Sequence, residues 1–249
     1  MGELLLLLRL EGPLQSWGTR SRWDVRDTGA EPSKSGVVGL LGCALGLRRD
    51  NPELERLDRA LRLGVRVDRP GLISTDYQTV TGYHRTAGGE FKVSGGTVKN
   101  LAKARENGES TIVSPRDYLH DARFLVVLAS KDPSLLRQLA GEREHPNWAG
   151  DLCHPRWPLY LGRKSCVPTC PVFFRLTEDY ESVEDALHRA EWSKPAWEAQ
   201  PPARLDAWVE DPRGDAERQD SLRLNQGRFY AFRRCSYIPI PTSSLGGTQ

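Results

Sequence analysis

Residues 31–46 read EPSKSGVVGLLGCALG, and this stretch predicts the first helix of the fold. Ser33 is a favourable N-cap for a helix that begins at Lys34 or Ser35. Glycines recur along the helix at spacings of three or four residues, so they share one face. They are Gly36, Gly39, Gly42 and Gly46. Because each glycine inside a helix costs about 1 kcal/mol relative to alanine, a neighbour must approach this bare face closely.

Two neighbours fit that face. The protein's own sheet is expected along most of the helix, and a phosphate suits only its amino end, where free N–H groups lie beside Ser33, Lys34 and Ser35. A nucleotide-binding Walker loop is excluded, because it needs glycines six and one positions before the lysine and the sequence has Thr28 and Ser33 there. A membrane-dimer face needs about 20 apolar residues, and charged residues begin too soon, at Arg48.

The segments around this helix predict an α+β fold. Residues 4–10 are apolar except for Arg9, which is typical of a strand buried on both faces. After Asn51-Pro52 the helical pattern resumes. Further strands are predicted at 64–71, 75–81 and 122–130, helices at 132–144 (with Asp132 as N-cap) and 182–192, and late strands within 228–240. The order strand, helix, strand, strand or arm, strand, helix resembles a ferredoxin-like, RRM-like unit.

Residues 83–116 differ from the rest of the chain. They contain two Gly-Gly pairs and few apolar residues that could build a core. Their basic residues are Arg85, Lys92, Lys99, Lys103, Arg105 and Arg116. A polar, glycine-punctuated segment of this length in a compact domain is usually a functional loop or an arm.

The composition is that of a soluble globular protein, with 38% hydrophobic and 27% charged residues and a net charge of +2. The leucine run at 4–8 is too short to span a membrane and lacks the flanks of a signal peptide. We therefore expect a cytoplasmic protein with no membrane partner and five reduced cysteines. Cys166 and Cys170 have no second pair at zinc-ligand spacing, so no metal is expected, and no motif requires a cofactor.

Basic residues meet aromatic residues or glycines at four places, a combination that favours RNA binding. The first is the loop that contains Trp17, Arg20 and Arg22, the second is the helix start at Lys34 and Ser35, and the third is the arm. The fourth is the turn YLGRKSCVP at 160–168, in which Tyr160 precedes Gly162, Arg163, Lys164 and Ser165.

Signals for catalysis are weaker. His84 beside Tyr83, or His120 beside Asp121, could act as acid or base in RNA cleavage without a metal. No serine elbow, HExxH or paired-carboxylate motif is present. A metal-independent endoribonuclease is therefore kept as the alternative to a non-catalytic RNA-binding protein.

Five stretches in order resemble the Cas family-five subunit of the type I-E CRISPR surveillance complex, Cascade, within the RAMP superfamily. They are GPLQSWG (12–18), PSKSGVVGLLGCALGLRRD (32–50), DYQTVTG (76–82), RDYLHDARF (116–124) and YLGRKSCVP (160–168). The match runs to about residue 170, and the remaining residues carry no distinctive motif.

The resemblance implies a ferredoxin-like RAMP body at 1–82 and 117–170 and an inserted β-hairpin thumb at 83–116. Residues 171–249, beyond the match, are expected to form a β-rich extension. It implies a non-catalytic subunit of an antiviral ribonucleoprotein complex that binds the 5′ handle of the CRISPR RNA (crRNA) and caps the backbone. The expected partners are the crRNA, the backbone subunit CasC and the large subunit CasA, with target DNA met only through the complex. In this type a separate endonuclease, CasE, processes the RNA.

The resemblance makes Arg116 and Tyr160 the leading candidates for contacts with the handle, and it assigns the thumb lysines to the RNA backbone. Relatives in type I-C cleave RNA with tyrosine, lysine and histidine, but Tyr83-His84 has no matching lysine neighbour here. The residues expected to bind RNA are Gln15, Trp17, Arg20, Arg22, Lys34, Ser35, Lys92, Lys99, Lys103, Arg116, Tyr160, Gly162, Arg163, Lys164 and Ser165.

Overall fold

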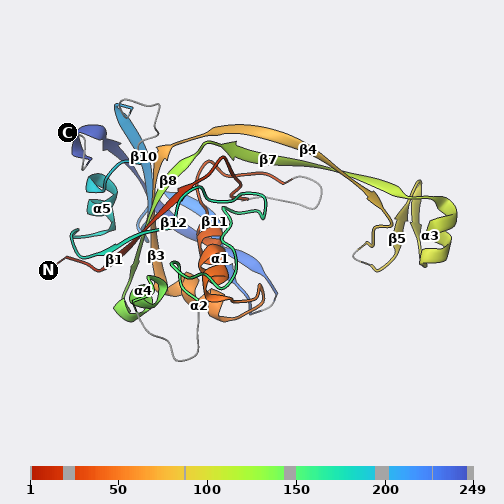
Figure 1. The fold of residues 1–249 in the computed structure, drawn as a ribbon, viewed down its shortest axis with the longest axis horizontal. Coiled ribbons are helices and arrows are strands. Elements are labelled where there is room, and N and C mark those ends of the chain that lie inside the picture. The colour runs from red at the N-terminus through yellow and green to blue at the C-terminus, as the bar shows by residue number, and fades with distance from the viewer. Residues whose placement is uncertain are drawn as a thin grey trace.

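The computed structural model describes residues 2–18, 26–86, 88–142, 150–193, 202–225 and 227–245. It consists of a body built on one large sheet and a long arm that projects from the body (Figure 1). The body sheet has seven strands in the order β11-β12-β10-β3-β8-β1-β9, and each neighbouring pair is antiparallel. The strands are β1 (Leu5–Glu11), β3 (Leu61–Arg69), β8 (Arg123–Ser130), β9 (Phe173–Thr177), β10 (Arg204–Glu210), β11 (Ala216–Arg223) and β12 (Phe229–Pro241).

The central strand β1 is buried on both faces, as its leucine run predicts. Leu5 and Leu7 pack into a core that includes residues of α5 (Val183–Arg189). Leu6 and Leu8 point to the opposite face and pack with the other helices of the body. Those helices are α1 (Lys34–Leu45), α2 (Glu53–Ala60) and α4 (Pro133–Leu139). Helices thus cover both faces of the sheet, which explains why the strand has almost no polar side chain.

Helix α1 begins at Lys34, as its sequence predicts, and ends at Leu45, so that Gly46 lies just beyond the helix rather than inside it as expected. The Ser33 hydroxyl accepts a hydrogen bond from the Gly36 N–H at 3.3 Å. Gly46 follows the last turn in the left-handed conformation, with φ of 71°, which glycine adopts without strain. Asp132 likewise caps α4, where its carboxylate accepts from the Ser134 N–H at 2.9 Å.

The glycines of α1 do not all have a close neighbour. A Cβ at Gly36 would lie 2.8 Å from the Trp17 ring, and one at Gly42 would collide with Leu54 of α2. A Cβ at Gly39 would meet nothing within 4 Å. The expectation of a bare face laid against the sheet is therefore wrong: a tryptophan and a helix approach two of its positions, and the third is open.

Alanine substitutions at these glycines should have opposite effects on stability, depending on whether a neighbour lies close to the position. Gly39→Ala is expected to raise the free energy of unfolding by about 0.5–1 kcal/mol, because alanine removes backbone entropy from the unfolded chain. Gly36→Ala should lower it, since the new methyl group would press on a rigid, buried indole ring. Chemical denaturation of both variants checks this, and equal shifts in the two would contradict the packing at Trp17.

The arm is a long two-stranded ribbon with a folded tip. Its strands β4 (Leu72–Gly82) and β7 (Ser110–His120) pair along their full length, and β2 (Leu14–Gln15) adds to β7 at the body. The tip comprises β5 (Phe91–Val93), β6 (Gly96–Val98) and α3 (Leu101–Asn107). The ribbon therefore starts about ten residues before the expected boundary at 83. The tip also has a small core of Phe91, Val93 and Ala104, which the polar sequence did not indicate.

The remaining described elements complete the body, with a short 3-10 helix at η1 (Thr242–Ser244) near the carboxyl end. All five cysteines are described, and their thiols are free. Within the described ranges, no helix is both long and apolar enough to cross a membrane. The same ranges contain no group of three or more His, Cys, Asp or Glu residues placed to hold a metal ion.

Candidate nucleic-acid interface

Three chain segments meet where the arm leaves the body: the end of β2, the base of β7 and the turn at 161–166. The Ser16 N–H donates to the Leu161 carbonyl at 3.0 Å. Within the turn, the Leu161 N–H donates to the Cys166 carbonyl at 2.7 Å, and the Cys166 N–H donates to the Arg163 carbonyl at 2.9 Å. These bonds close the turn and attach it to β2.

Gly162 makes this attachment possible. Its φ of 97° lies in the region that side chains disfavour. A Cβ at this position would also overlap the carbonyl oxygen of Ser16. Glycine is needed twice over, for its backbone angle and for the close approach of two chain segments.

Arg163 points inward and joins the turn to the base of the arm. Its guanidinium carbon lies 4.7 Å from the centre of the Tyr118 ring, which is cation–π range. Its Nη2 donates to the Arg26 carbonyl at 2.9 Å. Burial alone would raise the pKa of Tyr118, but hydrogen bonding to Arg163 and Ser165 outweighs it, so this pKa lies below its ordinary value. Arg163 and Tyr118 thus form one polar unit beneath the surface.

Arg116 lies two residues before Tyr118 on β7, so both side chains project from the same face of the ribbon. Its Nε donates to Ser114 at 3.4 Å. The backbone around it is fixed by Arg26, whose N–H donates to the Pro115 carbonyl at 3.0 Å and whose carbonyl accepts from the Asp117 N–H at 2.8 Å. Arg116 is half-buried.

The turn brings its own candidates to this place. Lys164 and Ser165 are exposed, and Tyr160 is half-buried. The structure therefore gathers the predicted Arg116 and the predicted turn at one site. It adds Tyr118, which sequence reasoning missed although the spacing Arg116, Tyr118, His120 would have placed the three on one face of a strand.

Three predicted RNA contacts are wrong, because the side chains are buried and their polar groups are hydrogen-bonded within the protein. Gln15 is fully buried, and its amide donates to the carbonyls of Leu10 at 3.0 Å and Ala122 at 2.7 Å. Trp17 is 1% exposed, and its indole N–H donates to Gln15 at 3.0 Å. A ring this deeply buried cannot stack on a base.

Lys34 is the third correction. It is 3% exposed, and its ammonium donates to both carboxylate oxygens of Glu210 at 2.7 and 2.8 Å. Its backbone N–H donates to the Asp220 carboxylate at 2.8 Å. A carboxylate of the protein therefore occupies the place at the helix start that the sequence suggested for a phosphate. Ser35, next to it, is half-buried.

The remaining candidates lie apart from the base of the arm. Arg20 and Arg22 lie outside the described residues. Lys92, Lys99 and Lys103 are exposed at the tip of the arm. The eleven residues of β4 separate that tip from the body by about 35 Å at the usual rise per residue, so these lysines cannot share one binding site with Lys164.

The two candidate catalytic histidines also lie far apart. The His120 Nε2 is hydrogen-bonded to the Ser74 hydroxyl at the base of the ribbon. The His84 Nε2 lies 3.0 Å from the Val80 carbonyl at the far end. They cannot act as the acid and the base of a single cleavage site.

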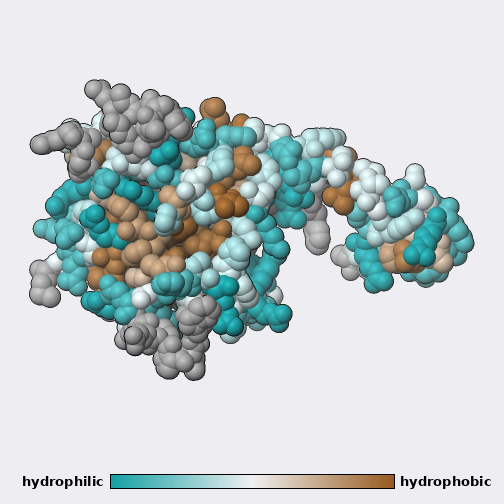
Figure 2. Space-filling view, in the orientation of Figure 1, coloured by the Kyte–Doolittle hydropathy of each residue, from teal (hydrophilic) through white to brown (hydrophobic). Residues whose placement is uncertain are grey.

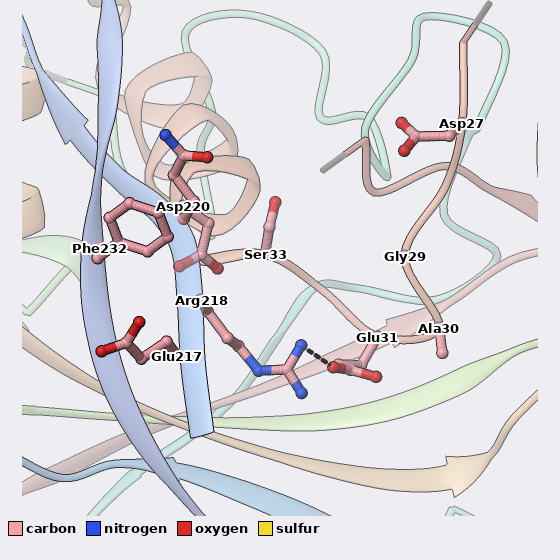
Figure 3. A pocket seen from close by; sticks show the side chains of 10 residues that line it. Asp27, Gly29, Ala30, Glu31, Ser33, Glu217, Arg218, Asp220 and Phe232 are labelled. Carbon is pink, nitrogen blue, oxygen red and sulfur yellow. Dashed lines mark ion pairs between the residues drawn. The ribbon is translucent and has the colours of Figure 1, made fainter. Parts of the chain in front are cut away.

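A separate concavity of about 480 Å³ lies beside the start of α1, between residues 27–33 and strands β11 and β12 (Figure 3). Four of its ten lining residues are carboxylates: Asp27, Glu31, Glu217 and Asp220. The lining residue Arg218 is ion-paired with Glu31 and stacks on Trp208 at 4.4 Å. Asp220 and Glu217 are ion-paired with Arg233 and Arg234, so arginines neutralise most of these carboxylates.

Comparisons with known proteins find similar sequences and similar structures. The family described as "CRISPR-associated protein (Cas_Cas5)" matches residues 5–234. The chain is 36% identical over 173 residues to the CRISPR system Cascade subunit CasD of Escherichia coli (strain K12), which covers 68% of this chain and 69% of that protein. A structure described as a Cas protein matches with a TM-score of 0.66 and 34% identity, covering 97% of both chains. A chain of a CRISPR RNA-guided surveillance complex matches with a TM-score of 0.68 and 30% identity, covering 98% of this chain and 95% of that one.

Proposed function

Because the chain belongs to the Cas5 family of CRISPR-associated proteins, we propose that it is a subunit of an RNA-guided surveillance complex and binds the 5′ handle of the crRNA there. One observation supports this assignment: the turn at 161–166, with its exposed Lys164 and Ser165, is attached through Arg163 to the base of the arm, where Arg116 lies two residues from Tyr118 on β7. Cations and hydroxyl groups at one place suit the backbone of single-stranded RNA.

The site has an inner and an outer layer. Gly162, Arg163 and Tyr118 are packed against the body and fix the turn. Lys164, Ser165 and Arg116 hold the phosphates, and Tyr160 stacks on an unpaired base, which is the usual way in which proteins read single-stranded RNA. The role of the inner layer is to position the outer one.

The fold supports the same assignment. Strands β9, β1, β8 and β3 lie side by side, and α1 and α2 follow β1 while α4 follows β8. This β-α-β-β-α-β order supports a ferredoxin-like RAMP body. In the complex, the backbone subunit CasC and the large subunit CasA would be the protein neighbours, and the lysines of the arm tip would meet the RNA away from the handle.

Lys164→Ala should weaken binding of handle RNA by about five- to tenfold and reduce the dependence of affinity on salt by about one counterion. Arg116→Ala should have an effect of similar size. Fluorescence anisotropy with the full chain and handle RNA, measured over a range of salt concentrations, checks both expectations.

Lys131→Ala is the matched control, because Lys131 is an exposed lysine at the opposite end of β8. Its affinity and salt dependence should equal those of the unchanged protein. If Lys131→Ala and Lys164→Ala weaken binding equally, the affinity comes from overall charge and the site at the base of the arm is wrong.

A further inference from the structure

A basic surface with exposed aromatic rings surrounds the carboxyl end of α1. Three chain segments meet there: residues 46–49, which follow the helix, residues 156–157 of the loop before the turn at 161–166, and residues 228–230 at the start of β12. The hairpin between β11 and β12 lies beside the chain that leaves α1 (Figure 1). Hydrophilic residues are prominent along this edge of the body, below the arm (Figure 2). We call the three segments the α1-end surface.

Helix capping does not explain why arginines gather at this helix end. Cations near the carboxyl end of a helix often bind its last carbonyls, but here backbone N–H groups already do so. The Cys43 carbonyl accepts a hydrogen bond from the Trp157 N–H at 3.1 Å, and the Ala44 carbonyl accepts one from the Arg156 N–H at 2.8 Å. The arginine side chains are therefore not needed to complete the helix.

Arg228 holds the β11–β12 hairpin against the chain that follows α1. Its Nη1 donates to the Arg49 carbonyl at 2.7 Å. Its Nε donates to the Tyr230 hydroxyl at 3.2 Å, and its guanidinium carbon lies 5.9 Å from the centre of the Tyr230 ring. The Tyr230 side chain is thus fixed beside Arg49 while remaining 36% exposed.

The charges of the α1-end surface are mostly positive and exposed. Arg48 and Arg49 are both exposed, and no carboxylate of the described residues forms an ion pair with either. Asp50 beside them offsets one charge, whereas Glu53 is already paired with Arg56 at 2.8 Å. Unpaired guanidinium groups at the surface are suited to binding phosphates.

The loop adds a second accessible ring to these cations. The Trp157 side chain is 39% exposed, and its backbone is held on the end of α1 by the bond to the Cys43 carbonyl. Arg156, also exposed, packs closely on the same helix end, since a Cβ at Gly46 would collide with its side chain. Aromatic rings on a rigid support beside arginines are typical of surfaces that bind single-stranded nucleic acid.

From these features we infer that the α1-end surface is a second binding site for single-stranded nucleic acid. Arg48 and Arg49 bind phosphates, and Trp157 and Tyr230 stack on unpaired bases. A duplex does not fit, because its bases are stacked on one another and are not available to the rings. Two strands have this chemistry, the crRNA and a single strand of DNA, and the experiments below distinguish them.

The second site is separate from the base of the arm, so it goes beyond the proposed function. The first turn of α1 lies near the base, where Gly36 contacts the Trp17 ring. Leu45, at the other end of the helix, is nine residues further on, which is about 14 Å at the usual rise per residue. One nucleotide cannot contact both places.

Fluorescence anisotropy tests the site in the full chain, with Arg116→Ala and Lys164→Ala present to remove the proposed site at the base of the arm. The probes are labelled oligouridylate and oligothymidylate of about 12 nucleotides. Adding Arg49→Glu is expected to weaken binding by about tenfold and to reduce its salt dependence by at least about one counterion. The folded structure should be unchanged, because Arg228 contacts the Arg49 carbonyl and not its side chain.

Arg213→Glu in the same background is the matched control, since Arg213 is an exposed arginine before the opposite end of β11. It should change affinity less than twofold. If Arg49→Glu and Arg213→Glu have equal effects, or if neither oligonucleotide binds the background protein, the second site is wrong.

Photocrosslinking in the assembled complex identifies the strand. The full chain carries p-azido-phenylalanine in place of Trp157 or, as the control, in place of Tyr237, which is equally exposed at 39% but lies eight residues along β12 from Phe229 at the hairpin. The complex is prepared with crRNA, without and with a double-stranded DNA target. An adduct of the probe at 157 with crRNA in both preparations identifies the crRNA as the occupant. An adduct with DNA, formed only when the target is present, identifies a DNA strand.

The probe at 237 should form no adduct with nucleic acid. The inference is overturned if the probe at 157 reacts only with a protein subunit, if it forms no adduct, or if both probes label nucleic acid equally.

The two proposals can fail separately. If Lys164→Ala leaves binding of handle RNA unchanged while Arg49→Glu weakens binding of the oligonucleotides, the site at the base of the arm is wrong and the α1-end surface holds. If Lys164→Ala behaves as expected and Arg49→Glu has no effect, the second site alone is wrong.

Discussion

Gly162→Ala is expected to lower the free energy of unfolding by at least about 2 kcal/mol and to reduce binding of handle RNA by more than the loss of Lys164 does. The φ of 97° at this position strains any residue with a Cβ, and the added methyl group would also overlap the Ser16 carbonyl oxygen. The turn would have to leave β2, and it would take with it the Arg163 guanidinium that contacts both Tyr118 and the Arg26 carbonyl.

Gly95→Ala is the control for backbone strain. Gly95, in the turn between β5 and β6, also has a positive φ, 85°, but a Cβ there would meet nothing within 4 Å. This variant should lose only about 1 kcal/mol and keep its affinity for RNA. Urea denaturation measures the stability of both variants, and fluorescence anisotropy measures their affinity for RNA. Together they distinguish backbone strain from the overlap with the Ser16 carbonyl oxygen. If the two variants lose equal stability, the close approach of the turn to β2 is not what requires glycine at 162.

The sequence was sufficient to predict the elements that local patterns specify. The length of the leucine run and the Gly-Pro that follows it favoured a strand buried on both faces over a helix, and Ser33 and Asp132 cap helices as expected. These features depend on neighbours within a few residues, where propensity and capping rules apply.

The sequence could not show where a basic side chain ends up once the chain folds. Lys34 was expected to bind a phosphate. Its ammonium group instead donates a hydrogen bond to the carboxylate of Glu210, 176 residues further along the chain. Trp17 and Gln15 looked like surface recognition residues and instead support the base of the arm from inside. Pairings between distant segments depend on tertiary contacts, which one sequence does not reveal.

Tertiary contacts also explain what the family motifs do in this chain. Gln15, Trp17, Ser33 and Gly162 all belong to the stretches on which the resemblance rests, and each has an inward role: a buried amide, a buried ring, a helix cap and a close approach. Under the proposed function they shape and hold the RNA site, and the side chains proposed to contact RNA, Lys164 and Ser165, are exposed on that support.

Arg66→Met should be the most destabilising single substitution considered, with an expected loss of about 3–5 kcal/mol. Arg66 on β3 is fully buried, and it donates to both carboxylate oxygens of Asp68. It also donates to the carbonyls at the end of α5 and just beyond, those of Leu187 and Ala190 at 2.8 Å each and of Glu191 at 3.0 Å. Methionine would fill part of the space but leave three carbonyls without the arginine donor and the buried Asp68 carboxylate with only the Ser193 N–H, at 3.2 Å.

Arg204→Met is the matched control, since Arg204 faces Asp206 two residues along β10 in the same arrangement. There both side chains are mostly exposed, at 64% and 55%, and the Arg204 Nε lies 3.9 Å from the Asp206 Oδ1. The loss of free energy of unfolding should therefore stay below about 0.5 kcal/mol. Denaturant unfolding of both variants measures the difference. A loss at Arg66 no larger than the loss at Arg204 would mean that α5 does not depend on this arginine for its attachment to the sheet, and that the body tolerates an unpaired Asp68 in its interior.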